Sequence, residues 1–191
     1  MSPGTNGGGG QPEDSETLVL PIARGWDGMP LPATEHAVLR VAFAGAALRI
    51  AVEAPFHGDP PPSAPAGPTW ALWEHEVVEL FVLGPDGSYT EIELGPFGHH
   101  LVLRLRGVRE VVERELPLEL AASVHGARWA AVARLDRRLL PAGPHRVNAY
   151  RIWGSGADRR YAAHAPVPGP APDFHRMECF VSAVIPESAS T

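Results

Sequence analysis

The sequence predicts an all-β protein, an antiparallel β-sandwich with one short helical turn. Three observations support this: many short runs alternate apolar and polar residues, Gly- and Pro-rich turns separate them, and helical periodicity is nearly absent. In the clearest stretch, strands are expected at 76–83, 89–94 and 99–106. The quartets GPDG and GPFG between them carry residues that tight turns need. Such a meander cannot bury both faces by itself, so the rest of the chain must supply a second layer.

The chain before the meander is expected to begin with a disordered Gly- and Pro-rich tail at 1–16. A first edge strand is predicted at 18–22, where a proline interrupts the run as it often does at sheet edges. The segments 36–43 and 47–54 flank Ala-Gly-Ala and predict a hairpin. The segment 55–68 is proline-rich, polar and broken, which predicts a loop.

The chain after the meander is predicted to continue mainly in short strands. The valines of 108–116 and the proline that follows favour a strand there. A helical turn is expected at 136–140, and a rigid proline-rich loop at 166–172. A single β-sandwich domain is thus expected over 17–186, followed by a C-terminal tail at 187–191. The segments 118–124 and 128–135 flank His-Gly-Ala and predict a second hairpin, and the remaining strands are predicted at 145–153, 159–163 and 180–185.

Composition argues against several classes of protein. The formal net charge of -6 argues against a nucleic-acid partner, which would require a basic face. Arginines are scattered and no lysine-rich run occurs, which argues against an anionic membrane surface. The N-terminus lacks the basic and apolar regions of a secretory signal, so a soluble cytoplasmic protein is expected. Cys179 is the only cysteine and is expected to be a small buried apolar residue.

A polar face is predicted on the meander. Strand periodicity places Glu91 and Glu93 on one face of the second strand, with Glu79 and Arg104 expected beside them from its neighbours. Carboxylates and arginine make planar hydrogen bonds that suit vicinal hydroxyls. The alternative is a solvent-facing sheet with cross-strand charge pairs. This placement assigns the leucines of the third strand to the opposite, apolar face: Leu101, Leu103 and Leu105.

Tryptophans supply a second set of candidates. Sugars present flat C–H faces that stack on indole rings, although core packing is the commoner role of the residue. Trp129 is expected in the core, whereas Trp73 and Trp153 are expected to be partly exposed. Arg151 and His175 complete the predicted ligand-binding set, and His175 follows a proline loop that could place it at a pocket mouth.

No metal, cofactor or catalytic residue is predicted. The run HEVVE at 75–79 superficially resembles a helical zinc-hydrolase motif with Glu in place of the second His. Its valines favour a strand, which would hold residues 75 and 79 roughly 13 Å apart. Nucleophile-elbow, P-loop and dinucleotide-binding glycine patterns are missing from the sequence.

Four longer motifs carry a family resemblance: EAPFHGDPP at 53–61, LWEHEVVELF at 72–81, YTEIELGPFGHHLVL at 89–103 and PDFHRMECF at 172–180. They resemble an uncharacterised family of small soluble proteins found in bacteria and animals, over nearly the whole chain from 18 to 184. That family is similar in pattern to family 9 carbohydrate-binding modules and other DOMON-like β-sandwiches. The resemblance implies a carbohydrate-binding-module-like sandwich. Such modules grip a sugar between two tryptophans, and the sequence alone does not identify that pair.

The sequence therefore predicts a non-catalytic domain that binds a small polar ligand, a saccharide above all. Two other classes stay open: an enzyme using Glu79, Glu91 or His175 as acid–base groups, and an interaction domain acting through its proline loops. A raised carboxylate pKa in a deep pocket would favour the enzyme. A large exposed apolar patch beside the loop at 55–68 would favour the protein partner.

Overall fold

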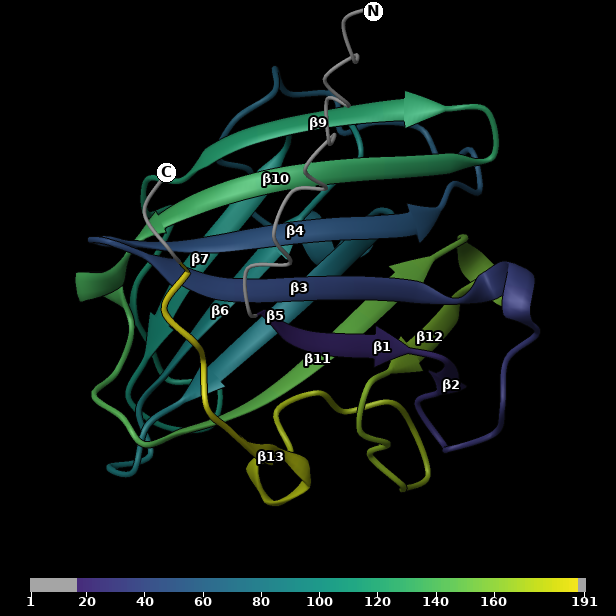
Figure 1. Ribbon diagram of the computed structural model, residues 1–191. Coiled ribbons are helices and arrows are strands. Elements are labelled where there is room, and N and C mark those ends of the chain that lie inside the picture. The colour runs from purple at the N-terminus through teal and green to yellow at the C-terminus, as the bar shows by residue number, and fades with distance from the viewer. Residues whose placement is uncertain (1–16, 189–191) are drawn as a thin grey trace, which may run out of the picture.

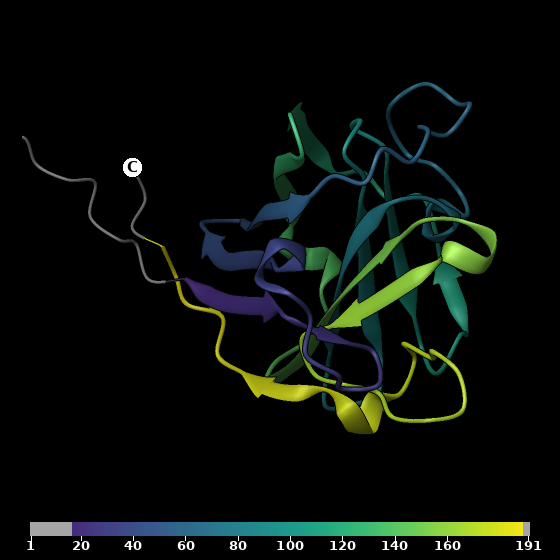
Figure 2. The ribbon, with the colours of Figure 1, turned by 90° about the vertical axis from the view of Figure 1, so that its right-hand side faces the viewer.

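The computed structural model describes residues 17–188, which form two antiparallel sheets packed face to face. Figure 1 looks through the two layers, and Figure 2 shows them from the side. The predicted antiparallel β-sandwich is therefore confirmed. The tail predicted at 1–16 and the last residues of the one predicted at 187–191 lie outside the described residues. Within 17–188, no helix is long or apolar enough to cross a membrane.

The first sheet, sheet A, contains the N-terminal edge strand and the two predicted hairpins. Its order is β1-β3-β4-β10-β9, so β4 and β10 join the hairpins at its centre. The predicted edge strand and hairpins are confirmed to within one or two residues. The bounds are β1 (Leu18–Ile22), β3 (Ala37–Ala44), β4 (Ala47–Pro55), β9 (Glu119–His125) and β10 (Arg128–Asp136).

The second sheet, sheet B, is built around the meander. Its order is β2-β12-β11-β5-β6-β7-β8, and β13 extends the edge of β11. The predicted meander is confirmed. The last three residues of HEVVE lie in strand β5, so this run does not form the helix that a zinc-hydrolase motif requires. The bounds are β2 (Arg24–Gly25), β5 (Val77–Leu83), β6 (Tyr89–Leu94), β7 (His100–Leu105), β8 (Val111–Glu113), β11 (His145–Trp153), β12 (Arg160–Ala163) and β13 (Val181–Ala183).

Three predicted elements differ in extent, one of them the strand expected at 180–185, of which only the three residues of β13 form. The strand expected at 108–116 is only the three residues of β8, because the β7–β8 ladder shifts register and Arg109 turns the chain with a φ of 58°. The helical turn expected at 136–140 is a 3-10 turn that Asp136 caps by accepting a hydrogen bond from the Arg138 amide. The 3-10 turns of the described chain are Ala33–Glu35, Leu72–Glu74, Arg137–Leu139, Gly156–Asp158 and Met177–Cys179.

The apolar residues form two layers rather than one. The main core lies between the sheets and contains Trp129, as predicted. A second apolar cluster covers the outer face of sheet B, where Leu72, Phe174 and Phe180 from the connecting segments pack on the strands. Every residue of β5 and β6 is therefore buried. This second layer positions the candidate site.

The C-terminal segment ties the two sheets together. β13 pairs with the first residues of β11 in sheet B. Farther along, the Phe43 amide donates to the Pro186 carbonyl at 2.8 Å, and the Ser188 amide donates to the Phe43 carbonyl at 2.7 Å. The C-terminal segment thus stays attached to sheet A for two residues beyond the boundary predicted at 186.

A buried polar group, the Arg151 cluster, closes one end of the sandwich. It consists of Glu35, His57, Glu76, Arg151 and Trp153. The Arg151 guanidinium lies over the Trp153 ring and donates to His57 Nδ1 at 2.6 Å, which leaves the proton of His57 on Nε2, facing Glu35 Oε2 at 2.9 Å. Glu76 accepts the His57 amide at 3.1 Å, and burial raises the pKa of Glu76 to about 7. These bonds hold the start of the 55–68 loop against the sheets.

We expect Arg151→Ala to lower the free energy of unfolding by about 3–5 kcal/mol, because it leaves buried acceptors without their cationic donor. Chemical denaturation at neutral pH measures this change. Arg40→Ala is the matched control, since the Arg40–Glu53 pair is largely exposed and should be worth less than about 1 kcal/mol. Equal effects of the two substitutions would contradict a structural role for the cluster.

Candidate functional site

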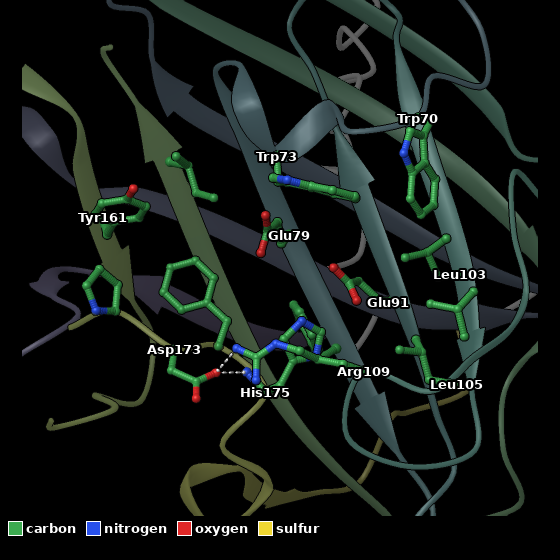
Figure 3. Close-up of a pocket in the computed structure, with 15 residues that line it drawn as sticks. Trp70, Trp73, Glu79, Glu91, Leu103, Leu105, Arg109, Tyr161, Asp173 and His175 are labelled. Carbon is green, nitrogen blue, oxygen red and sulfur yellow. Dashed lines mark hydrogen bonds and ion pairs between the residues drawn. The ribbon is translucent and has the colours of Figure 1, made fainter. Parts of the chain in front are cut away.

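A cavity of about 380 Å³ opens on the outer face of sheet B, where the second apolar layer is incomplete. Strands β5, β6 and β7 form its floor, and the segments at 70–73, 109–111 and 172–175 form its rim. Figure 3 shows the carboxyl groups of Glu79 and Glu91 in the middle of the cavity, between Trp73 on one side and His175 on the other. The cavity thus combines polar floor groups with aromatic walls.

Three carboxyl groups are clustered at the floor. Glu79 pairs directly with Glu93 across β5 and β6, and Glu91 follows on the same face of β6. Their exposed fractions are 1% for Glu79, 5% for Glu91 and 0% for Glu93. Glu79 and Glu91 line the cavity, whereas Glu93 lies next to them on the same face and does not line it. Within 17–188, both Glu93 oxygens and Glu91 Oε2 have no donor when the acids are ionised.

The pKa values of the floor carboxyl groups are far above the ordinary value of a glutamate side chain. Burial raises the pKa of Glu91 to about 8, against an ordinary value of 4.5. Burial raises the pKa of Glu79 strongly, and repulsion from Glu91 adds to it. The pKa of Glu93 is also well above its ordinary value, because of burial and then the charge of Glu79. At neutral pH the floor therefore offers hydroxyl donors as well as acceptors.

His175 lies in the cavity wall in a defined tautomer. The Tyr89 hydroxyl accepts the Arg109 amide at 3.1 Å, so its own proton is free to be donated to His175 Nδ1, at 2.7 Å. Burial and the nearby Arg109 lower the pKa of His175 to about 4, so the imidazole is neutral. The ring proton consequently resides on Nε2 and provides a donor.

The rim carries an ion pair and an aromatic corner. Arg109 Nη2 donates to Asp173 Oδ1 at 2.7 Å, which also accepts the His175 amide at 3.1 Å. Opposite them, the rings of Trp70 and Trp73 meet edge to face, with centroids 5.2 Å apart and an interplanar angle of 79°. Since the rings are nearly perpendicular, they form a corner rather than two parallel plates.

The structure brings together five of the eight predicted site residues. Trp73, Glu79, Glu91 and His175 line the cavity, and Glu93 lies beside Glu79 on the same face of sheet B. The predicted place of Arg104 is wrong. Arg104 pairs across the strands with Thr90 rather than with a glutamate, and it forms an exposed ion pair with Glu113 at 2.5 Å.

The leucines of β7 occupy the face that the sequence analysis assigned to Arg104. Leu103 stands opposite Glu91, and Leu101 stands opposite Glu93. Strand parity alone predicts a wholly polar carboxylate face. In the structure this face carries both carboxyl groups and leucines. Leucines are favourable there because apolar segments cover the face and shield it from water.

Arg151 and Trp153 are also placed away from the cavity. Arg151 pairs across the strands with Val78, which faces the inter-sheet core, whereas Tyr150 pairs with Glu79 on the outer face. Trp153 is only 8% exposed, so its expected exposure is wrong. Both residues belong to the Arg151 cluster, on the other side of sheet B from the carboxyls.

Several cavity residues escaped the sequence analysis. Arg109 lies in the turn between β7 and β8, next to the register shift of their ladder. Tyr161 lies in β12, and Phe174 lies in the loop after the second proline-rich segment. The loop bearing Asp173 and His175 did carry a signal, since polar residues after a proline loop often line a site. Within 17–188 there is no group of three or more His, Cys, Asp or Glu side chains suited to holding a metal ion.

The sandwich is similar to solved carbohydrate-binding structures. A candidate carbohydrate-binding protein from Bacteroides uniformis superposes with a TM-score of 0.68 at 18% identity, covering 86% of this chain and 84% of that one. A family 9 carbohydrate-binding module from Caldicellulosiruptor kristjanssonii in complex with cellotriose gives 0.55 at 10% identity, over 98% and 92%. The glucose complex of such a module gives 0.52 at 14% identity, over 98% and 94%. These values define the class of fold, a carbohydrate-binding-module-like β-sandwich.

Sequence comparison then identifies the family. The chain is 39% identical over 172 residues to the UPF0462 protein C4orf33 homolog of Danio rerio, covering 83% of this chain and 85% of that protein. It is 38% identical over 170 residues to the UPF0462 protein C4orf33 of Homo sapiens, with 84% and 85% covered. No family model matches the chain. The chain belongs to the UPF0462 family, and the family resemblance noted in the sequence is confirmed.

We expect stability to fall as pH rises from about 7 to about 8. The folded protein holds a proton on Glu91 up to a pKa of about 8, whereas the unfolded chain releases it near 4.5, so folding is progressively disfavoured between these values. The neutral, buried His175 opposes this fall only weakly above about pH 7, where the histidine of the unfolded chain is also mostly neutral. Thermal unfolding in matched buffers measures the slope.

Glu93→Gln should flatten this slope, because a neutral amide replaces a buried acid that must ionise. The exposed Glu53→Gln is the matched control and should leave the slope unchanged. A wild-type slope retained in Glu93→Gln would show that the carboxyl cluster does not hold its protons as described.

Proposed function

We propose that this protein binds a saccharide in the cavity on the outer face of sheet B. The observation that carries the proposal is the cavity itself, in which a tryptophan corner lies opposite buried carboxyl groups. A sugar ring has apolar C–H faces suited to indole and hydroxyl edges suited to carboxyl groups. The similar fold of modules solved with cellotriose and glucose supports the same ligand class.

The polar groups of the cavity can both donate hydrogen bonds to a polyol and accept hydrogen bonds from it. Protonated Glu79 and Glu91 each offer one donor together with acceptor oxygens. His175 offers the Nε2 proton, since Tyr89 occupies Nδ1. A cavity of about 380 Å³ is at the small end for ligand pockets, which suits a short saccharide.

We expect Trp70→Ala to weaken saccharide binding by about tenfold or more, equal to about 1.4 kcal/mol. Trp70 is 46% exposed, so its ring can be removed with little effect on the fold. Calorimetric titration of wild type and variant with glucose and cello-oligosaccharides measures the loss. Phe97→Ala is the control, because Phe97 is a partly exposed aromatic residue that does not line this cavity. Absence of binding to every sugar, or equal loss in both variants, would refute the proposal.

One observation favours an acid–base enzyme as a second candidate. The pKa of Glu91 is raised to about 8 inside the cavity, which is the feature that would favour catalysis. A protonated carboxyl at neutral pH can act as a general acid toward a glycosidic oxygen. Incubation with cello-oligosaccharides and aryl glycosides would then release product, with a loss of about 100-fold or more in Glu91→Gln. Binding of these compounds without release of product would refute the catalytic role and leave saccharide binding as the function.

A further inference from the structure

The carboxyl cluster lacks a cationic partner. Within 17–188, no ion pair or hydrogen bond joins a basic side chain to Glu79, Glu91 or Glu93. Arg109 and Arg159 are the arginines whose charges act on these acids, and Arg109 is paired with Asp173. Arg159 donates instead to three backbone carbonyls, those of Trp73, Glu74 and Gly154. The charges of Arg159 and Arg109 act on Glu79 and Glu91 only through space, so no direct cationic contact within 17–188 balances the negative charge that the acids can carry.

The unpartnered acid is directed at the cavity. Glu91 is 95% buried as a residue, since only 5% is exposed, and its Oε2 has no donor within 17–188. Figure 3 shows the Glu91 and Glu79 carboxyls facing the same open volume. A shared proton provides one hydrogen bond between acids, whereas an ammonium group provides three donors and a full positive charge. The cluster is thus better satisfied by a cation than by protons alone.

The walls of the cavity suit an organic cation rather than a metal ion. Aromatic rings attract ammonium groups through their faces. Five aromatic residues line the volume above the acids: Trp70, Trp73, Phe81, Tyr161 and Phe174. A divalent ion would instead require oxygen ligands on most sides. Among the described residues, His175 is the only imidazole lining the cavity, and it has one nitrogen engaged by Tyr89 and a proton on the other.

We infer that the ligand of this cavity carries a protonated amine, so that the matching saccharide is an amino sugar. This inference rests on the saccharide function proposed above and names the ligand class within it. The amine lies at the Glu79 and Glu91 carboxyls, and the sugar ring packs against the tryptophan corner. Binding converts at least one protonated acid to a carboxylate, and the released proton passes to solvent.

Calorimetric titration at pH 7 compares glucosamine, glucose and N-acetylglucosamine. Glucosamine should bind about tenfold or more tightly than glucose, because only its amine is charged. N-acetylglucosamine retains the nitrogen but is neutral, so it should show no such advantage over glucose. Repeating the glucosamine titration in buffers of different ionisation enthalpy should reveal release of about one proton per site, and glucose should release none.

The proton count can be assigned because few groups face the cluster. Besides the three acids, these are Tyr89 and Tyr150 beside them, His175 and Asp173 on the covering loop, and Arg109 and Arg159. The pKa of Tyr89 is raised to about 12 and that of Tyr150 still further, so neither ionises near neutral pH. His175 is already neutral. Released protons therefore come from the carboxyls.

The decisive variant is Glu91→Gln, with Glu79→Gln as a second should the first fail to fold. The ratio of glucosamine to glucose affinity should fall from about ten toward one, whereas exposed Glu53→Gln should keep the wild-type ratio. Equal affinities of the wild type for the two sugars would overturn the amine assignment and leave saccharide binding standing. A preference unchanged in the glutamine variants would also overturn it. Failure of all three sugars to bind would overturn the proposed function itself.

Discussion

The burial of sheet B on both of its faces is the constraint on which the rest of the structure depends. One face packs on sheet A, and the other is covered by the segments that carry Leu72, Phe174 and Phe180. Acids on the outer face of β5 and β6 consequently lie in an apolar environment instead of in water, and their charged forms are penalised. Where the covering segments leave a gap, the same acids form the floor of a cavity. Fold and candidate site therefore have one physical origin.

The strands were predictable because their signals are local. Alternation of apolar residues and the turn quartets place the meander and both hairpins within one or two residues of the observed bounds. The exception is the segment after β7, where a register shift and the positive φ of Arg109 end the regular pattern. Strand periodicity states which residues share a face of one strand. It does not state which residues of neighbouring strands lie on the same face of the sheet. Arg104 was therefore predicted on the wrong face.

The candidate site was only half predictable for a related reason. Glu79, Glu91 and Glu93 could be grouped from strand parity and the order of the meander. Trp70, Arg109 and Phe174 reach the cavity from separate connections and Tyr161 from β12, and their meeting depends on how those connections fold over sheet B. Arg151 illustrates the opposite error, since a charged residue in a strand suggests a surface, yet here it is enclosed at the sandwich end by His57 and Glu35.

The attachment of the C-terminal segment to both sheets has a consequence for biosynthesis. β13 and the residues around Glu187 are the last parts of the sandwich to leave the ribosome, and they complete edges of β11 and β3 that formed much earlier in synthesis. Until then, the nascent chain presents these unpaired strand edges together with the apolar surfaces beside them. Such surfaces are the ones that chaperones recognise and that promote aggregation. Closure of this sandwich therefore waits until its last segment has been synthesised, and its yield in a cell depends on how well the nascent chain is protected before that point.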